Sequence, residues 1–241
     1  MKNYELLPYS DDLLLAKAVA DLWWENVVAA APSRKPLSIA LAGGRVARRF
    51  FAAAAQHAAT HPEALAEVHF FWGDERCVPG SDPESNYSVA EENFLRPARV
   101  EPSRIHRIRG ELPPAQAAAE AEAEVLGIVP GGAAHLPVFD LVLLGMGEDG
   151  HVASLFPNGP TDLSPGQPIY LPIIGPKPPP QRITMTYPTL GRAREVWVLA
   201  SGVGKVQALR DSLDPEGVTP LARLLRLRHN TTIFTDINLA A

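Results

Sequence analysis

Two ionisable side chains, Asp149 and His151, lie in a glycine-rich stretch, residues 145–151, with the sequence GMGEDGH. The apolar run before it, residues 138–144, predicts a strand buried on both faces of a mostly parallel sheet, and the residues after it favour a short helix. Glycines permit the turn, and the carboxyl end of such a strand is where open α/β sheets bind ligands. Because histidine titrates near neutral pH, we expect His151 to act as a general base beside Asp149. A purely structural histidine is the alternative.

The glycines of this bend also fit G-x-G-x-x-G, the fingerprint of a dinucleotide-binding site. That fingerprint requires an acidic residue about 20 positions later, which binds the ribose. No Asp or Glu occurs between Leu163 and Arg194. In addition, Glu148 and Asp149 would place two carboxylates beside the pyrophosphate, at a like-charge cost. We therefore expect no dinucleotide cofactor.

A second pair of glycines, Gly43 and Gly44, follows a predicted strand at residues 37–42 and precedes a predicted helix at residues 46–59. In this arrangement the unpaired N–H groups of the helix start can bind a phosphate. A tight turn without a ligand is the alternative.

Two further strand ends carry charged residues. The GDER stretch, residues 73–76, follows a predicted strand at residues 68–72 and could form a second part of a site or a solvated turn with a local ion pair. Lys205 follows the sequence GVG at the start of a predicted helix, like half of a nucleotide-binding P-loop. Because Val206 stands where that motif has Ser or Thr, we expect no nucleotide there. Lys205 could still hold a phosphate as a point charge.

The bulk composition narrows the class of protein. The chain has 241 residues, of which 46% are hydrophobic and 20% charged, as in ordinary soluble globular proteins. A net charge of −5 without a dense Lys/Arg run argues against a nucleic-acid partner. Cys77 is the only cysteine, which excludes a disulfide framework and a thiolate zinc site. With neither a signal-peptide pattern nor about 18 uninterrupted apolar residues, we expect a cytoplasmic enzyme with no membrane partner.

Strands and helices alternate along the sequence, which predicts a single α/β/α domain over residues 1–241. The first helix is expected to begin with Ser10 as its N-cap and to end before Pro32. Residues 157–181 contain nine prolines, and we expect a long loop that forms a rim or lid near His151. The other expected elements are strands at residues 105–108, 183–186, 196–200 and 231–235, and helices at residues 88–95, 113–126 and 221–227.

Four stretches together resemble the 6-phosphogluconolactonases in order and spacing: WGDERCVPGSDPESNYSVAEENFL, FDLVLLGMGEDGHVASLFP, PPPQRITMTYPTL and LASGVGKVQAL. The resemblance runs from about Leu37 to the C-terminus. It implies a three-layer α/β/α fold with a Rossmann-like, mostly parallel sheet, of the sugar-phosphate isomerase-like kind. It also implies a hydrolase of carbohydrate metabolism that converts 6-phospho-D-glucono-1,5-lactone to 6-phosphogluconate in the pentose phosphate pathway, without a metal or nucleotide cofactor.

Carried over by position, the resemblance implies roles for individual residues. His151 corresponds to the proposed base, Asp149 to its neighbour in the loop, and Arg76 to a substrate-binding arginine. Lys205 and Arg182 correspond to basic positions near the phosphate. The further residues that we expect to bind substrate or phosphate are Gly43, Gly44, Arg45 and Asp74.

The first glycine loop departs from the family pattern. The family usually has Ser-Gly-Gly-Ser-Thr-Pro or a close variant there, whereas residues 42–47 read AGGRVA, so the hydroxyls that would assist the phosphate are missing. One interpretation is that Arg45 replaces them, since a guanidinium binds phosphate in a bidentate manner. The alternative is a substrate other than the usual one.

Lactone hydrolysis needs an activated water, a stabilised oxyanion and a proton for the departing ring oxygen. His151 could move the proton, while backbone N–H groups of the bend, together with Arg76, could stabilise the oxyanion. No G-x-S-x-G elbow supports an acyl-serine route, and no paired-histidine spacing supports a metal.

Two alternative functions stay open. A glucosamine-6-phosphate deaminase-like isomerase shares the glycine bend, but such relatives continue from the histidine toward an Asn-Glu-Pro segment, whereas residues 152–157 read VASLFP. A non-catalytic sugar-phosphate-binding protein would not need Asp149, His151, Arg76 and Lys205 together. The expected partner is therefore a small sugar-phosphate lactone, and the expected assembly a monomer or a weak homodimer.

Overall fold

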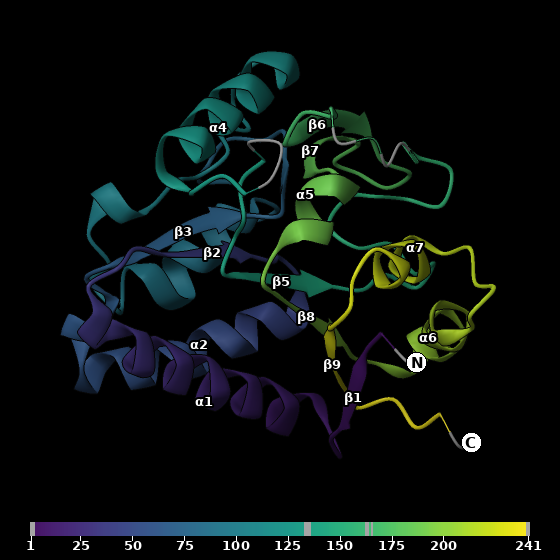
Figure 1. Ribbon diagram of the computed structural model, residues 1–241, viewed down its shortest axis with the longest axis horizontal. Coiled ribbons are helices and arrows are strands. Elements are labelled where there is room, and N and C mark those ends of the chain that lie inside the picture. The colour runs from purple at the N-terminus through teal and green to yellow at the C-terminus, as the bar shows by residue number, and fades with distance from the viewer. Residues whose placement is uncertain (1–2, 133–135, 162–163, 165, 240–241) are drawn as a thin grey trace.

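The computed structural model describes residues 3–132, 136–161, 164 and 166–239. Its main sheet has six strands in the order β1-β9-β8-β5-β2-β3, with every neighbouring pair parallel (Figure 1). Inner strands of such a sheet are covered on both faces, which explains their continuous apolar runs. The strands are β1 (Glu5–Pro8), β2 (Leu37–Leu41), β3 (Val68–Trp72), β5 (Leu141–Gly145), β8 (Glu195–Ala200) and β9 (Thr232–Thr235).

Helices cover both faces of this sheet. Figure 1 shows α1 (Asp12–Ala30) and α2 (Arg45–Thr60) on one face, and α5 (Tyr187–Arg192) and α7 (Pro220–Arg226) on the other. The three-layer α/β/α architecture expected from the sequence is therefore confirmed. The other helices are α3 (Asn86–Ala90), which continues as a π-helical turn (Glu91–Leu95), α4 (Pro114–Ile128) and α6 (Val206–Leu213). Short 3-10 turns span Ala31–Ser33, Pro62–Leu65, Pro102–Arg104 and Val203–Lys205.

Aromatic side chains join the helices of one layer. The rings of Phe50 on α2 and Phe94 in the π-helical turn meet Trp23 of α1 edge-on, at centroid distances of 5.8 and 5.5 Å. All three side chains are buried. The edge-to-face arrangement suits the charge distribution of aromatic rings and adds to the free energy gained from their burial.

A second, antiparallel sheet was not expected from the sequence. It consists of β4 (Asp74–Arg76), β7 (Gln181–Met185) and β6 (Tyr170–Ile174), in the order β4-β7-β6. Because β6 lies within residues 157–181, the prediction of a continuous loop there was wrong. Pro172 fits into β6 because this strand is at the edge of its sheet, where one side needs no N–H donors.

The start of α1 also differs from the prediction. Its N-cap is Asp11 and not Ser10, because the carboxylate of Asp11 accepts hydrogen bonds from the N–H groups of Leu13 and Leu14 at 3.0 and 2.8 Å. A carboxylate at this position also interacts favourably with the positive end of the helix dipole.

Three further elements were misplaced or missed. Residues 105–108 form no strand, since Ile105 alone makes an isolated bridge, to Phe70. Strand β1 pairs with β9, a strand more than 220 residues away in the sequence. Such a partner leaves no local signal, and β1 and α5 were both absent from the prediction.

Before the glycine bend the strand is shorter than predicted, and after the bend the expected helix is absent. Strand β5 begins at Leu141 and not at residue 138. After the bend, Val152 makes single bridges to Met146 and to Leu155 in place of a helical turn. These bridges fold the chain back over the end of β5, which keeps His151 at the carboxyl edge of the sheet. Within the described residues, no helix combines the length and apolarity needed to cross a membrane.

Candidate active site

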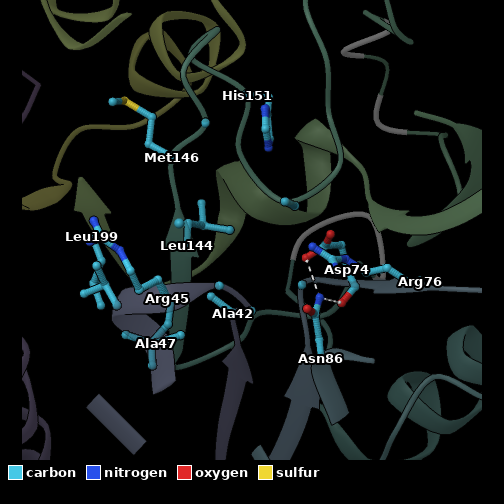
Figure 2. Close-up of a pocket in the computed structure, with 18 of the residues that line it drawn as sticks. Ala42, Arg45, Ala47, Asp74, Arg76, Asn86, Leu144, Met146, His151 and Leu199 are labelled. Atoms are coloured by element: carbon cyan, nitrogen blue, oxygen red, sulfur yellow. Dashed lines mark hydrogen bonds between the residues drawn. The ribbon is translucent and has the colours of Figure 1, made fainter. Parts of the chain in front are cut away.

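The carboxyl ends of β2, β3, β5 and β8 surround one cavity of about 230 Å³. Parallel strands end at the same edge of a sheet, so turns that are far apart in the sequence meet there. Figure 2 shows His151 on one side of this cavity and Arg45, Asp74 and Arg76 around the other sides. Eight of the nine predicted site residues line it: Gly43, Gly44, Arg45, Asp74, Arg76, His151, Arg182 and Lys205.

The ninth residue, Asp149, orients the histidine. Its Oδ1 lies 2.5 Å from Nδ1 of His151 and also accepts a hydrogen bond from the His151 backbone N–H at 3.2 Å. Because an ionised carboxylate can only accept, Nδ1 carries the proton and Nε2 keeps a lone pair. Burial alone would raise the pKa of Asp149, but the positive charge that His151 carries when protonated, together with its hydrogen bonds, outweighs burial and holds that pKa below its usual value. No described residue hydrogen-bonds Nε2, so this atom can accept a proton from a ligand or a water.

Packing explains why the bend is rich in glycine. A Cβ atom on Gly147 would lie 2.0 Å from Nδ1 of His151. Gly150 has a φ of 75°, and a Cβ there would lie 2.7 Å from Cβ of Thr219, the N-cap of α7. The glycines therefore make room for the histidine and for a helix start, a role unrelated to dinucleotide binding.

Phe156 packs between His151 and Arg182. Its ring centroid lies 4.7 Å from that of His151 and 5.6 Å from the guanidinium carbon of Arg182. Gly175 approaches this stack from the turn before β7, where a Cβ would lie 3.0 Å from Phe156 and 3.1 Å from Nε of Arg182. The stack connects the histidine loop to the proline-rich segment.

The proline-rich segment reaches the edge of the site, although no described residue within it lines the cavity. Arg182 donates from Nε to the carbonyl oxygen of Pro179 at 3.1 Å and from Nη2 to that of Lys177 at 3.4 Å. Nζ of Lys177 also lies 4.0 Å from Oε2 of Glu148. The rim or lid expected over residues 157–181 stays a prediction, and residues 162, 163 and 165 lie outside the described residues.

Arg76 on β4 and Arg182 on β7 are direct partners in the register of the small sheet. Nη1 of Arg76 donates to the carbonyl oxygen of Glu84 at 2.8 Å, whereas its buried Nε has no partner among the described residues. Burial and, next, repulsion from Arg76 lower the pKa of Arg182. Two guanidinium groups are thus held side by side at the cavity.

The carboxylate of Glu75, within the GDER stretch, points away from the cavity. It accepts hydrogen bonds from the N–H groups of Arg76, Asn86 and Tyr87 at 2.7, 2.8 and 2.8 Å, and from Oγ of Ser85 at 3.0 Å. Burial raises the pKa of Glu75 to about 7, against the opposing effect of these four hydrogen bonds. Glu75 therefore fixes the start of α3 beside Arg76.

Arg45 and Lys205 stand at two helix starts that face the cavity. The Arg45 side chain is 65% exposed, and its Nη1 lies 3.5 Å from Oδ2 of Asp12, a loose ion pair at the cavity rim. Lys205 makes no ion pair with any described residue. Burial and, next, the charge of Arg45 lower its pKa from the usual 10.5. An anion between these two cations would relieve their repulsion.

Two residues of the site were not identified from the sequence. Asn86 lines the cavity, and Ser154 lies fully buried behind it. Both bind Asp74: Nδ2 of Asn86 donates to Asp74 Oδ1 at 3.2 Å, and Oγ of Ser154 donates to Asp74 Oδ2 at 2.6 Å. In the structure Asn86 lies at the start of α3 and Ser154 lies in a turn, positions where both residue types commonly have a local role. No local signal distinguishes them from such residues.

Taken together, the cavity combines four cations with one lining carboxylate. The cations are those of Arg45, Arg76, Arg182 and Lys205, and the carboxylate is that of Asp74. The cavity lining is therefore positively charged, whereas the whole chain has a net charge of −5. Such a charge distribution favours a small anionic ligand, and the Asp149–His151 pair next to it has the geometry of a histidine base oriented by a carboxylate.

Comparison with known proteins places the chain in a family. The family described as "Glucosamine-6-phosphate isomerases/6-phosphogluconolactonase" matches residues 10–234. The chain belongs to this family. It is 36% identical to the 6-phosphogluconolactonase of Streptomyces coelicolor over 219 residues, which cover 88% of this chain and 84% of that protein. It is 35% identical to the human 6-phosphogluconolactonase over 239 residues, covering 97% and 90% of the two chains.

Solved structures agree with this assignment. The 6-phosphogluconolactonase from Trypanosoma brucei superposes with a TM-score of 0.86 at 28% identity, covering 98% of this chain and 97% of that one. A monomeric glucosamine-6-phosphate deaminase superposes with a TM-score of 0.80 at 18% identity, covering 98% of both chains, which shows a shared fold alone. The sugar-phosphate isomerase-like fold expected from the sequence is therefore confirmed.

Proposed function

We propose that this protein hydrolyses 6-phospho-D-glucono-1,5-lactone to 6-phosphogluconate, as a hydrolase of the pentose phosphate pathway. The observation that carries the proposal is the joint geometry of one cavity. A histidine with an unengaged Nε2, oriented by Asp149, faces the same space as four cations. The names of the two relatives at 35% and 36% identity support this substrate over other sugar phosphates.

In the proposed reaction, Nε2 of His151 removes a proton from a water molecule as its oxygen attacks the lactone carbonyl carbon. The carbonyl oxygen becomes an oxyanion, which Arg76 and backbone N–H groups of the glycine bend stabilise. When the tetrahedral intermediate collapses, the bond from the carbonyl carbon to the ring oxygen breaks. The imidazolium of His151 then returns its proton to that oxygen, which becomes a hydroxyl. The Asp149 carboxylate stabilises the imidazolium between these steps.

The phosphate is proposed to lie between Arg45 and Lys205, against the N–H groups that follow Gly43 and Gly44 at the start of α2. Arg182 lies farther along the same cavity and adds positive potential. Arg45 would exchange its loose, exposed ion pair with Asp12 for a charge-assisted contact with phosphate. This arrangement accounts for the AGGRVA sequence, in which a guanidinium replaces the hydroxyls of the family loop.

We place this reaction in the cytoplasm, carried out by a monomer or weak homodimer on a small-molecule substrate. Sedimentation velocity of the purified protein measures the state of assembly. A stable tetramer would contradict the proposed assembly without affecting the proposed reaction.

The decisive experiment compares three substrates with one protein preparation. Acid release is measured above the spontaneous background with the phosphorylated lactone and with glucono-1,5-lactone, and ammonia release with glucosamine 6-phosphate. We expect rapid hydrolysis of the phosphorylated lactone, much slower hydrolysis of the unphosphorylated one, and no ammonia. Ammonia release, or no acid release above background with any lactone, would overturn the proposal.

A further inference from the structure

The Asn86 side chain is held in one orientation at the cavity wall. It is 3% exposed, and its Nδ2 donates to the carbonyl oxygen of Asp74 at 2.8 Å and to Oδ1 of Asp74 at 3.2 Å. Figure 2 shows both bonds as dashed lines. A flipped amide would point its oxygen at these two oxygen atoms. The network therefore assigns the nitrogen to Asp74 and leaves Oδ1 on the other side of the amide.

Oδ1 of Asn86 accepts no hydrogen bond from any described residue. It lies against Gly43, where a Cβ would come within 1.8 Å of it. Glycine at this position therefore preserves the space beside Oδ1, at the wall of the cavity that Asn86 lines. A nearly buried acceptor without a donor costs free energy unless a ligand or water supplies one. Unlike the buried Nε of Arg76, Oδ1 of Asn86 is not closed off from solvent, so it is an oriented acceptor that water or a ligand can reach from the cavity.

The chemistry of the proposed substrate limits what can bind there. The lactone carbonyl, the ring oxygen and the oxygens of a fully ionised phosphate only accept hydrogen bonds, whereas Oδ1 needs a donor. The sugar hydroxyls are donors. We propose that Oδ1 of Asn86 accepts a hydrogen bond from one hydroxyl of the bound sugar phosphate and so determines specificity for that hydroxyl. The inference rests on the proposed function for the class of ligand, and on the geometry of Asn86 for the contact.

Ser154 provides a matched control within the same network. Its Oγ donates to the other oxygen of Asp74 at 2.6 Å, as Asn86 donates to the first. Ser154 is fully buried and does not line the cavity. Removing either side chain weakens the support of Asp74, but removing Asn86 alone also removes an acceptor from the cavity.

The experiment measures dissociation constants by calorimetry, which needs no turnover. The ligands are 6-phosphogluconate and its analogues that each lack one hydroxyl. The proteins are the wild type, Asn86→Ala, Asn86→Asp and Ser154→Ala, each checked for folding by circular dichroism. Asn86→Asp retains an oxygen acceptor at the position of Oδ1. The measured quantity is the ratio of the dissociation constants of an analogue and the parent acid, so a general loss of affinity cancels.

For one analogue, we expect wild-type binding to be about tenfold weaker than that of the parent acid. In Asn86→Ala this ratio should fall to within about twofold of one, since the acceptor is gone. Ser154→Ala and Asn86→Asp should keep the wild-type ratio, Asn86→Asp with weaker binding of every ligand because its carboxylate lies beside Asp74. If Asn86→Ala does not fold, Asn86→Leu takes its place, because its side chain fills a similar volume without an acceptor, and its ratio should likewise fall to within about twofold of one.

Three results would overturn the inference. In the first, the ratio of dissociation constants is the same in Asn86→Ala as in the wild type. In the second, the ratio is lost in Ser154→Ala as well as in Asn86→Ala. In the third, the wild type binds all the analogues as tightly as the parent acid. A failure of the proposed function gives a different result, in which the wild type binds the sugar phosphates with the expected ratios but hydrolyses no lactone.

Discussion

Two histidine–carboxylate pairs in this protein have the same first contact and different surroundings. Nδ1 of His106 lies 2.8 Å from Oε1 of Glu124, and Nδ1 of His151 lies 2.5 Å from Oδ1 of Asp149. In the first pair, Nε2 of His106 is bound by Nδ1 of His69 at 2.8 Å, and Nε2 of His69 is bound in turn by Arg104. In the second pair, Nε2 of His151 faces the cavity. The buried series of hydrogen bonds gives every ring nitrogen of His69 and His106 a partner within the protein. At the cavity, Nε2 of His151 has no such partner and can bind a ligand.

The cations show the same contrast. Arg228 is 5% exposed, and its guanidinium donates to the carbonyl oxygens of Leu190, Gly191 and Ala193 at 3.0, 3.0 and 2.8 Å, with further bonds to Arg194, Asn230 and Thr231. Among the described residues, Arg228 has no carboxylate partner, yet each of its guanidinium nitrogens donates hydrogen bonds, whereas the half-buried side chain of Lys205 makes neither a hydrogen bond nor an ion pair. A partly buried cation without a partner costs stability, so this difference supports the proposal that Lys205 serves a ligand, whereas Arg228 supports the fold.

The largest expected effect comes from removing His151 from the Asp149–His151 pair. His151→Ala should lower kcat for the phosphorylated lactone by roughly 10²–10⁴-fold, because the general base is removed. Its thermal unfolding should stay close to that of the wild type. The matched variant His106→Ala should show the reverse, with reduced thermal stability and near-normal kcat, because it interrupts the buried series of hydrogen bonds from Glu124 to His69. Near-normal turnover of a folded His151→Ala would remove His151 from the mechanism.

One substitution at Arg228 and one at Lys205 test whether each cation serves the fold. Arg228→Met leaves several buried carbonyl oxygens without donors and should lower the free energy of unfolding by about 3 kcal/mol, with an unchanged KM. Lys205→Met should leave the free energy of unfolding unchanged or raise it, because it removes a cation without a counterion. Urea unfolding measures both. A Lys205→Met protein as destabilised as Arg228→Met would show that Lys205 has a structural role.

A somewhat smaller effect is expected on substrate binding. Arg45→Ala and Lys205→Ala should each raise KM for the phosphorylated lactone by about tenfold to a hundredfold, the value of one charge-assisted contact. The KM for the unphosphorylated lactone should hardly change. Steady-state kinetics with both lactones test this, and Arg48→Ala, on α2 beyond the cavity, is a suitable control. If Arg45→Ala affects both lactones equally, or neither, Arg45 does not bind the phosphate.

The smallest expected effect is the pH dependence of the buried histidine chain. Burial, then the charges of Arg104 and His106, lower the pKa of His69 from 6.5 to about 4. The unfolded chain therefore binds a proton at this residue between these pH values while the folded chain does not, so His69 costs stability as the pH falls through this range. The wild type should unfold at a higher temperature than His69→Gln near pH 8. This advantage should shrink toward pH 4, because only the wild type loses stability through His69. A difference independent of pH would mean that His69 titrates alike in both states.

The sequence by itself determined much of the fold and most of the candidate site. The apolar runs of β2, β3, β5, β8 and β9 are local signals, as are the glycines that end three of them. Arg45, Asp74, His151 and Lys205 each follow a strand that the sequence predicts, and they lie near one another because parallel strands end at a common edge. Arg182 was placed by resemblance alone, since nothing in its own stretch indicates a site.

The tertiary structure alone decided the pairings between distant segments. β4 could be recognised as a strand only with β7, which lies about a hundred residues later and places Arg76 opposite Arg182. The same holds for Asn86, whose orientation depends on Asp74 and Gly43, and for His69, which needs His106 and Arg104. The physical reason is that periodicity, capping and turn preferences act over a few neighbouring residues, so they indicate whether a side chain faces the interior. Which partner it meets there is set by packing and hydrogen bonding between segments that the sequence keeps apart.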